Sequence, residues 1–122
     1  MKKFHLVFSV ITLIVVSSCD YIERPKSYFS DYQELKDSGI IEKGWVANFI
    51  PKSAYDIHEQ HDIDTNRVKM TFKFDENDTK PLTDSCNVKK TGEETIYFCK
   101  YRKSNIRIIT NAGKAKYSSE SI

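Results

Sequence analysis

The strict alternation of apolar and polar residues from Arg67 to Phe74 limits the possible folds more than any other feature of this chain. Successive side chains of a β-strand point to opposite faces of the sheet, so a period of two separates two sets of residues. The apolar set is Val68, Met70, Phe72 and Phe74, and the polar set is Arg67, Lys69, Thr71 and Lys73. The pattern predicts a strand with one face on the core and one basic face in solvent, as in an antiparallel sheet.

Further strands are expected on both sides of this segment, because runs rich in β-branched and aromatic residues are separated by turn residues. The expected strands are residues 55–61, 67–74, 95–102, 105–110 and 114–118. The first is a weaker candidate that would pair back on the second through a short polar turn. The last two flank Asn111, Ala112 and Gly113, and a glycine in a three-residue connection is typical of a bulged hairpin.

One helix is expected before the strands. Ser30 and Gln33 have the spacing of a capping box, in which each side chain satisfies a backbone N–H near the start of a helix. Aromatic and apolar residues recur on one helical face, and Gly39 is a suitable C-terminal stop, so the helix should lie within residues 27–38. Together these patterns predict an α+β domain, with one short N-terminal helix followed by a four- or five-stranded antiparallel sheet.

The first nineteen residues contain a processing signal. Lys2 and Lys3 precede an apolar run from Phe4 to Val16, which is shorter than the ~20 residues of a membrane-spanning helix. The run ends in Val16, Ser17, Ser18 and Cys19. These four residues resemble the lipobox of bacterial lipoproteins, which implies that residues 1–18 are a cleaved signal peptide and that Cys19 carries the lipid. The alternative is an ordinary secretory signal cut near Ser18.

Processing at this signal would leave a lipidated tether, residues 19–26, and a single small α+β domain, residues 27–122. The lipoprotein modification adds three acyl chains, and two or more chains hold a protein stably on a membrane. The resemblance therefore implies a protein anchored to the cell membrane that faces the periplasm or the cell exterior.

The charge of the processed chain excludes one class of partner. Loss of Lys2 and Lys3 would leave 17 basic and 17 acidic residues, so the basic excess that nucleic-acid binding requires is missing and no nucleic-acid partner is expected. Residues 19–66 have five basic and ten acidic residues, whereas residues 67–122 have twelve and seven. Either opposite charges meet across the fold, or a basic face serves anionic lipid headgroups, glycan phosphates or an acidic protein.

Two further cysteines, Cys86 and Cys99, would lie in a compartment where disulfides form and persist. A bridge across their twelve intervening residues would contribute roughly 3 kcal/mol of chain entropy. A redox role would require a close Cys-x-x-Cys pair, which is absent. We therefore expect a structural disulfide.

One segment has the composition of a metal site or of a hydrolase site. Its residues are Asp56, His58, Glu59, His61, Asp62 and Asp64. Imidazole and carboxylate ligands suit zinc, but on a strand His58 and His61 would point to opposite faces. Ser53 is close to His58 in sequence, yet no nucleophile elbow, phosphate loop or zinc-protease helix accompanies it. A solvated strand end, without a metal, a cofactor or catalysis, is the expected outcome.

The stretch before this segment is apolar, with Trp45, Phe49, Ile50 and Pro51 ahead of Lys52. It is expected to be core, although an exposed tryptophan could anchor a partner. The longer segment resembles a pattern found in small bacterial proteins of unknown function, many with lipoprotein signals, which implies a domain type but no activity. The pattern consists of Gly44, Trp45, Ile50, Pro51, Lys52, Ser53, Ala54, Ile57, Asp62, Ile63, Asp64, Thr65, Asn66, Phe72 and Phe74.

A third similarity is to the membrane-bound inhibitors of c-type lysozyme, small anchored β domains with a disulfide. It is carried by Ala112, Gly113, Lys114, Ala115, Lys116 and Tyr117. The serine that precedes the glycine in those inhibitors is missing here. The sequence as a whole predicts a non-enzymatic, lipid-anchored envelope protein that contacts the membrane through its anchor and interacts with an envelope protein or glycan. The alternative is an inhibitor or immunity-type binder of a cell-wall-active enzyme such as lysozyme.

Overall fold

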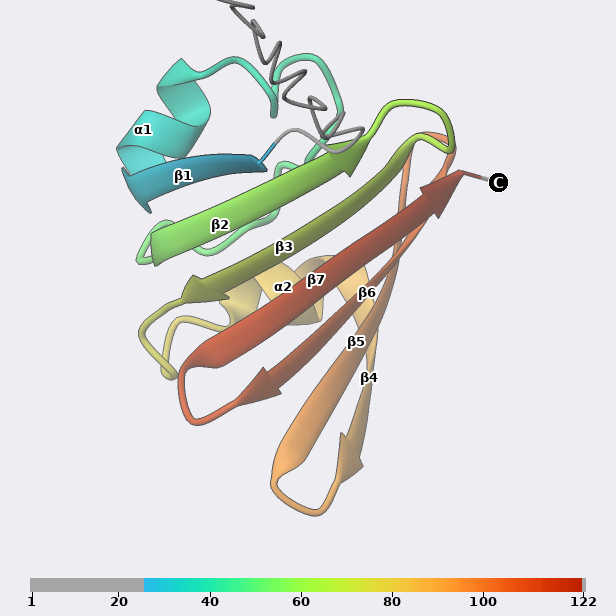
Figure 1. Ribbon diagram of the computed structural model, residues 1–122. Coiled ribbons are helices and arrows are strands. Elements are labelled where there is room, and N and C mark those ends of the chain that lie inside the picture. The colour runs from blue at the N-terminus through green and yellow to red at the C-terminus, as the bar shows by residue number, and fades with distance from the viewer. Residues whose placement is uncertain (1–25, 122) are drawn as a thin grey trace, which may run out of the picture.

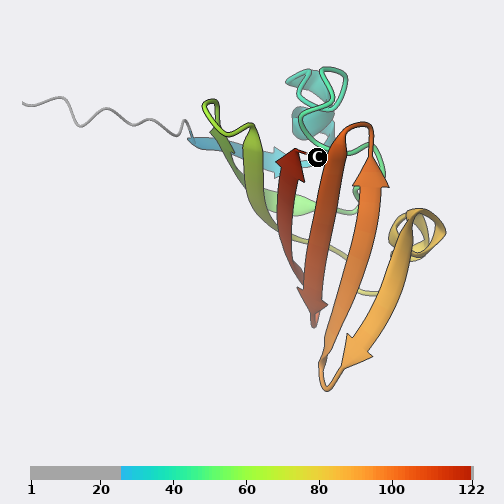
Figure 2. The same ribbon diagram turned by 90° about the vertical axis from the view of Figure 1, so that its right-hand side faces the viewer.

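The computed structural model describes residues 26–121, which form one seven-stranded antiparallel sheet with two short helices (Figure 1). The elements are β1 (Lys26–Asp31), α1 (Tyr32–Asp37), β2 (Tyr55–Asp62), β3 (Arg67–Lys73), α2 (Lys80–Ser85), β4 (Cys86–Thr91), β5 (Glu94–Tyr101), β6 (Ser104–Asn111) and β7 (Lys114–Ser121). The strand order is β1-β2-β3-β7-β6-β5-β4, so the last strand fills the middle of the sheet. The sheet is strongly twisted, and β4 runs at a steep angle to β1 (Figure 2). No helix within residues 26–121 is long and apolar enough to cross a bilayer.

The predicted fold class, one short N-terminal helix followed by a four- or five-stranded sheet, is wrong. The sequence patterns missed β1 and β4, which form the two edges of the sheet, and α2 is a second helix. An edge strand has a neighbour on one side only, and none of the side chains of β1 or β4 is fully buried. A strand without a buried face has no alternating pattern by which it could be recognised.

The helix expected within residues 27–38 is shorter than predicted, because the strand β1 precedes it. Asp31, rather than Ser30, caps it: the Asp31 side chain accepts a hydrogen bond from the backbone N–H of Glu34 at 3.0 Å. The Glu34 carboxylate in turn accepts one from the N–H of Ser30 at 2.8 Å. The capping box is therefore displaced by one residue from its predicted place. Gly39, with a φ of 83°, follows the end of the helix as expected.

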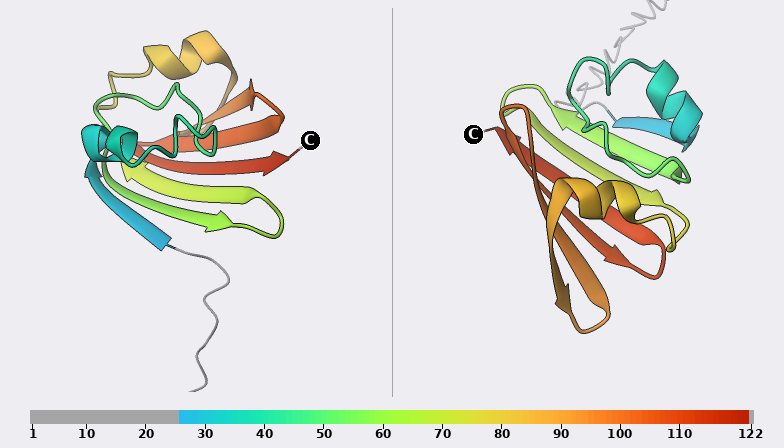
Figure 3. Two further views of the ribbon diagram at one scale, coloured as in Figure 1. Left: turned by 90° about the horizontal axis from the view of Figure 1, so that it is seen from above. Right: turned by 180° about the vertical axis from the view of Figure 1, so that it is seen from behind.

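The covering elements lie on one face of the sheet. Seen from behind, α1, α2 and the connection from α1 to β2 lie in front of the strands (Figure 3, right). Their apolar side chains pack against the strands in one core, which includes Leu35, Val46, Ile50, Leu82 and Ile108. The opposite face has no such cover from residues 26–121, and we call it the open face. Every second residue of each strand points to it.

The strand predicted at residues 67–74 is confirmed as β3, with Val68 and Met70 buried and Lys69 and Thr71 exposed. The other four expected strands are present as β2, β5, β6 and β7. β2 pairs back on β3, as predicted.

The β6–β7 turn is one residue shorter than predicted. Asn111 pairs with Lys114, so only Ala112 and Gly113 connect the strands, with φ of 49° and 75°. Two successive residues with positive φ are typical of the type I′ turn of a two-residue hairpin. A Cβ atom on Gly113 would also lie 2.8 Å from the backbone oxygen of Phe74, so a glycine fits there better than any other residue.

The expected disulfide between Cys86 and Cys99 is present. Cys86 is the first residue of β4 and lies directly opposite Cys99 on β5, with the two Cα atoms 4.4 Å apart. Cys86 therefore belongs to the edge strand itself. The bridge therefore ties the edge strand to its neighbour at one end of the β4–β5 hairpin.

Candidate functional site

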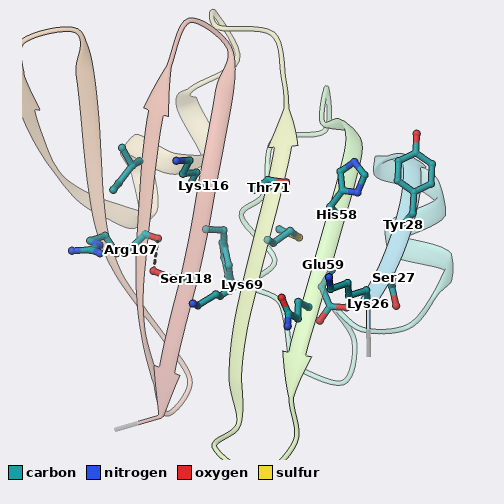
Figure 4. Close-up of a pocket in the computed structure, with 14 residues that line it drawn as sticks. Lys26, Ser27, Tyr28, His58, Glu59, Lys69, Thr71, Arg107, Lys116 and Ser118 are labelled. Atoms are coloured by element: carbon teal, nitrogen blue, oxygen red, sulfur yellow. Dashed lines mark hydrogen bonds between the residues drawn. The ribbon is translucent and has the colours of Figure 1, made fainter. Parts of the chain in front are cut away.

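A groove of about 650 Å³ crosses the open face of the sheet, over β1, β2, β3, β7 and β6 (Figure 4). Two adjacent rows of side chains line it, each running across the strands. The strand register defines these rows, since residues that are direct cross-strand partners point to the same face.

The first row, which we call the cationic row, consists of Lys26, Gln60, Lys69, Ser118 and Arg107. Each is the direct partner of the next across the ladder from β1 to β6. Its three basic residues come from β1, β3 and β6, with one neutral polar side chain between each pair.

The second row consists of Tyr28, His58, Thr71, Lys116 and Ile109, again as successive cross-strand partners. The rings of Tyr28 and His58 are in contact at its β1 end, with centroids 4.9 Å apart. Tyr28 is 57% exposed, so most of its ring faces solvent. The row combines aromatic, hydroxyl and aliphatic groups with one further cation.

The basic side chains of the groove are not neutralised by this part of the chain. Within residues 26–121, Lys26, Lys69, Arg107 and Lys116 form no ion pair, although all four are exposed. Glu59 also borders the groove, but its side chain turns toward the core and is only 5% exposed. The groove therefore presents four positive charges and no exposed carboxylate.

One ion pair lies on each side of the groove on the open face. On one side Lys73 lies 3.3 Å from Asp56, and on the other Arg67 lies 3.9 Å from Glu120. The hydrogen bond from Lys73 lowers the pKa of the Asp56 carboxyl from its ordinary value, and His58 adds to this effect. Paired cations thus flank the two rows, although Lys114, the cross-strand partner of Lys73, forms no ion pair within residues 26–121.

The histidines of the candidate metal site lie on opposite faces, as predicted. His58 is on the open face beside Asp56, whereas His61 is 6% exposed on the core side, with Nε2 3.2 Å from Oδ1 of Asn66. Asp62 and Asp64 lie at the β2–β3 turn, where Asp62 accepts the backbone N–H of Asp64. Within residues 26–121 no three His, Cys, Asp or Glu side chains are grouped as metal ligands.

The candidate catalytic serine has a structural role. Ser53 Oγ accepts the backbone N–H of Asp75 at 3.1 Å, and the N–H of Ser53 donates to Asp78 at 3.2 Å. These bonds tie the connection before β2 to the segment after β3. The hydroxyl is therefore engaged away from His58, which hydrogen-bonds to Asp56.

The apolar stretch near Trp45 is mostly core, as expected, since Phe49, Ile50 and Pro51 are buried. Trp45 itself is 42% exposed, and its ring makes a T-shaped contact with that of His61, with centroids 4.5 Å apart. It lies on the covered side of the sheet and takes no part in the groove.

On the core side of β2, two buried polar atoms have no hydrogen-bond partner within residues 26–121: Oε1 of Glu59 and Nδ1 of His61. Burial raises the pKa of the Glu59 carboxyl above its ordinary value of 4.5, and the nearby His61 opposes this shift.

Tyr117, which carries the similarity to lysozyme inhibitors, is a core residue. Its hydroxyl accepts the backbone N–H of Ala47 at 3.1 Å, and burial raises its pKa to about 12. The turn residues Ala112 and Gly113 and the strand residues that follow them form the β6–β7 hairpin. This stretch is explained by the fold, and of its residues Lys116 and Tyr117 line the groove.

The remaining predicted site, the lipid attachment at Cys19 and its lipobox, lies outside the described residues. The sequence patterns did not identify the groove either. Two signals pointed toward it: the basic excess of residues 67–122 and the basic set of the alternating strand, which supplies Lys69.

Searches of the curated proteins and of the solved structures found no match. A family model, that of the YbbD head domain, matches residues 23–73. The matched range contains β1, α1, β2 and β3, and nearly all of the pattern from Gly44 to Phe74 that resembles small bacterial proteins of unknown function. Over this range the chain is similar to the YbbD head domain, a small bacterial domain, and the match suggests a bacterial envelope-associated protein.

Proposed function

We propose that this chain is a lipid-anchored, non-enzymatic binding protein of the bacterial envelope, and that it contacts another envelope component through the groove on the open face. The observation that carries the proposal is the set of four unpaired cations, Lys26, Lys69, Arg107 and Lys116, in one groove. Like charges held close together repel one another, so an anionic partner would relieve this repulsion and gain affinity from it.

The non-enzymatic part of the proposal is supported by the partners of the residues considered for catalysis. Ser53 accepts a backbone N–H, and His58 contacts Asp56 and Tyr28. A nucleophile would need a base within hydrogen-bond reach and a third group to orient that base. Neither residue is held in such an arrangement.

The anchor is supported by the lipobox-like residues at the N-terminus and by the suggestion of an envelope protein from the family match. A Cys19→Ser chain should lose incorporation of labelled palmitate and should no longer sediment with membranes. Persistence of both label and sedimentation in this variant would exclude Cys19 as the lipid site.

The groove is tested by photo-crosslinking in cells. A benzophenone amino acid in place of Thr71, inside the groove, should give a discrete crosslinked product in the envelope fraction. The matched control is the same substitution at Thr83, an exposed threonine on α2. The control should give no such product, because α2 lies on the covered side of the sheet.

The charge requirement is tested on the same product. Lys69→Glu/Lys116→Glu should abolish it, whereas Lys36→Glu/Lys103→Glu, an equal change at exposed lysines outside the groove, should leave it intact. Equal products from both benzophenone positions, or a product insensitive to the groove charges, would contradict the proposal. If the crosslinked component is a cell-wall-active enzyme, the inhibitor or immunity-type alternative is favoured.

A further inference from the structure

Resting on the proposed function, we infer that the groove binds an anionic glycan, that is, an extended sugar chain with carboxylate or phosphate groups. This assigns a chemical class to the partner of the open face. Four features of the groove support it: the spacing of its cations, the neutral groups between them, the position of the groove within the sheet and the ion pairs on its flanks.

The cations of the cationic row recur at a regular spacing. Lys26, Lys69 and Arg107 lie on β1, β3 and β6, which are each two strands apart in the order β1-β2-β3-β7-β6. Neighbouring strands are about 4.8 Å apart, so these positions are separated by about 10 Å along a line of about 20 Å. A single small anion could contact only one of them. A ligand that engages all three must be extended and must carry its charges at intervals.

The groups between the cations suit a chain rich in hydroxyl groups. Gln60 and Ser118 alternate with the basic residues, and Thr71 lies next to them in the second row. Amide and hydroxyl side chains both donate and accept hydrogen bonds, as sugar hydroxyls do. The half-exposed ring of Tyr28 offers a flat apolar surface for the C–H face of a sugar ring.

The position of the groove in the sheet disfavours an acidic peptide. Peptides that bind to sheets usually add a strand at an edge, where backbone groups are free. The groove instead crosses β2, β3 and β7, whose backbone groups pair with strands on both sides. Along these three strands, which form most of the groove, only side chains are therefore available to a ligand. A recessed groove also fits a single chain better than the flat surface of a bilayer.

The limits of the groove define the ligand further. Asp56 beside Lys73 and Glu120 beside Arg67 place carboxylates on both sides of the two rows. Each of these carboxylates offsets one flanking cation, so the four unpaired cations of the rows attract an anionic chain more strongly than the paired ones do. We therefore expect the chain to run across the strands, from β1 to β6.

The test is a binding titration of the complete chain, purified in detergent, followed by amide chemical shifts. The probes are a galacturonic acid hexamer, a glucose hexamer with phosphate esters, and the unmodified glucose hexamer. The two anionic probes distinguish carboxylate from phosphate as the recognised group, and the neutral probe measures the part of the affinity that does not depend on charge. Shifts should be concentrated on β3 and β7. Binding should weaken as the ionic strength is raised from about 0.05 M to about 0.5 M, because exposed charges are screened.

Lys69→Gln/Lys116→Gln should weaken binding of an anionic hexamer about tenfold, the expected effect of losing two exposed ion pairs. Lys36→Gln/Lys103→Gln, with the same change in net charge outside the groove, should leave it within about twofold. An equal effect of the two variants would mean that the overall charge, and not the groove, attracts the ligand, and would overturn the inference.

If the partner of the groove is a membrane or an acidic protein, the binding results will differ from those expected for a glycan. Groove-dependent binding to phosphatidylglycerol vesicles or to polyglutamate, without binding of either anionic hexamer, would overturn the inference in favour of a membrane or an acidic protein. The proposed function would survive that result if the crosslink at Thr71 still depends on the groove charges. The proposed function would fail if no crosslink forms at Thr71, regardless of whether the hexamers bind.

Discussion

Replacement of Tyr117 by phenylalanine should remove one interaction that joins the covering connection to the centre of the sheet. The Tyr117 hydroxyl accepts the backbone N–H of Ala47 at 3.1 Å, and Tyr117 and Ala47 are 2% and 0% exposed. In Tyr117→Phe the N–H of Ala47 stays buried and loses its acceptor. An unsatisfied buried donor costs about 1–3 kcal/mol, so we expect the free energy of unfolding to fall by about 2 kcal/mol.

The assay is equilibrium unfolding in urea, followed by the fluorescence of Trp45, the single tryptophan of the chain. In a domain of this size, a loss of about 2 kcal/mol should lower Tm by about 8–16 °C. Tyr55→Phe, at a tyrosine that is 49% exposed, serves as the control and should change stability by less than about 0.5 kcal/mol. The slope of free energy against urea should not change, because the variant exposes the same surface on unfolding.

Alkaline pH gives an independent check on the same residue. The pKa of Tyr117 is raised from 10.0 to about 12 by burial, so the folded state holds this proton more tightly than the unfolded state. The associated stability is present below pH 10 and is lost as the pH rises through 12. Tyr117→Phe should lose less stability than the unmodified chain over this range. A loss below about 0.5 kcal/mol at neutral pH, together with an unchanged alkaline profile, would refute the reasoning.

Three further predictions concern other parts of the fold. Replacing Cys86 and Cys99 by alanine should lower the free energy of unfolding by about 2–4 kcal/mol, and two titratable thiols in the unreduced, denatured protein would rule the bridge out. Glu59→Gln should stabilise the fold more at pH 8 than at pH 4. Because the pKa of Glu59 is raised in the folded state, that state loses stability as the pH rises through 4.5 and above. Equal effects of the substitution on urea unfolding at both pH values would contradict this. Gly113→Ala should lower the free energy of unfolding by about 1–3 kcal/mol, and clearly more than Gly92→Ala does. Both glycines have a positive φ, but only at Gly113 would the added Cβ meet a backbone oxygen. Equal losses of stability in thermal unfolding would argue against this close contact.

The interior strands were predictable from the sequence because their neighbours bury one face. In β3, Val68, Met70 and Phe72 alternate with exposed residues, and the same is true of Tyr97 and Cys99 in β5. The edges were not predictable. β1 and β4 have no fully buried side chain, so their place in the sheet depends on partners elsewhere in the chain rather than on a pattern of their own.

The groove could not be predicted from the sequence for a related reason. The sequence indicates which residues of a strand share a face, but not which strands are neighbours. Ser118 on β7 has Lys69 as its partner on one side and Arg107 on the other. The two cations share one row only because β7 inserts between β3 and β6. The helix was misplaced by a smaller effect: Ser30 and Asp31 both suit an N-cap, and the pairing of β1 with β2 selects Asp31.

The central position of β7 has a consequence for how this chain acquires its structure. β1, β2 and β3 form one group of neighbours and β4, β5 and β6 another, and β7, the last of the seven strands to be synthesised, is what joins them. During translation both groups must therefore wait for residues 114–121 before the sheet can close. Pairings between distant segments also form slowly. Until residues 114–121 have emerged, the two groups of strands remain unjoined and the edges of β3 and β6 that β7 covers stay exposed.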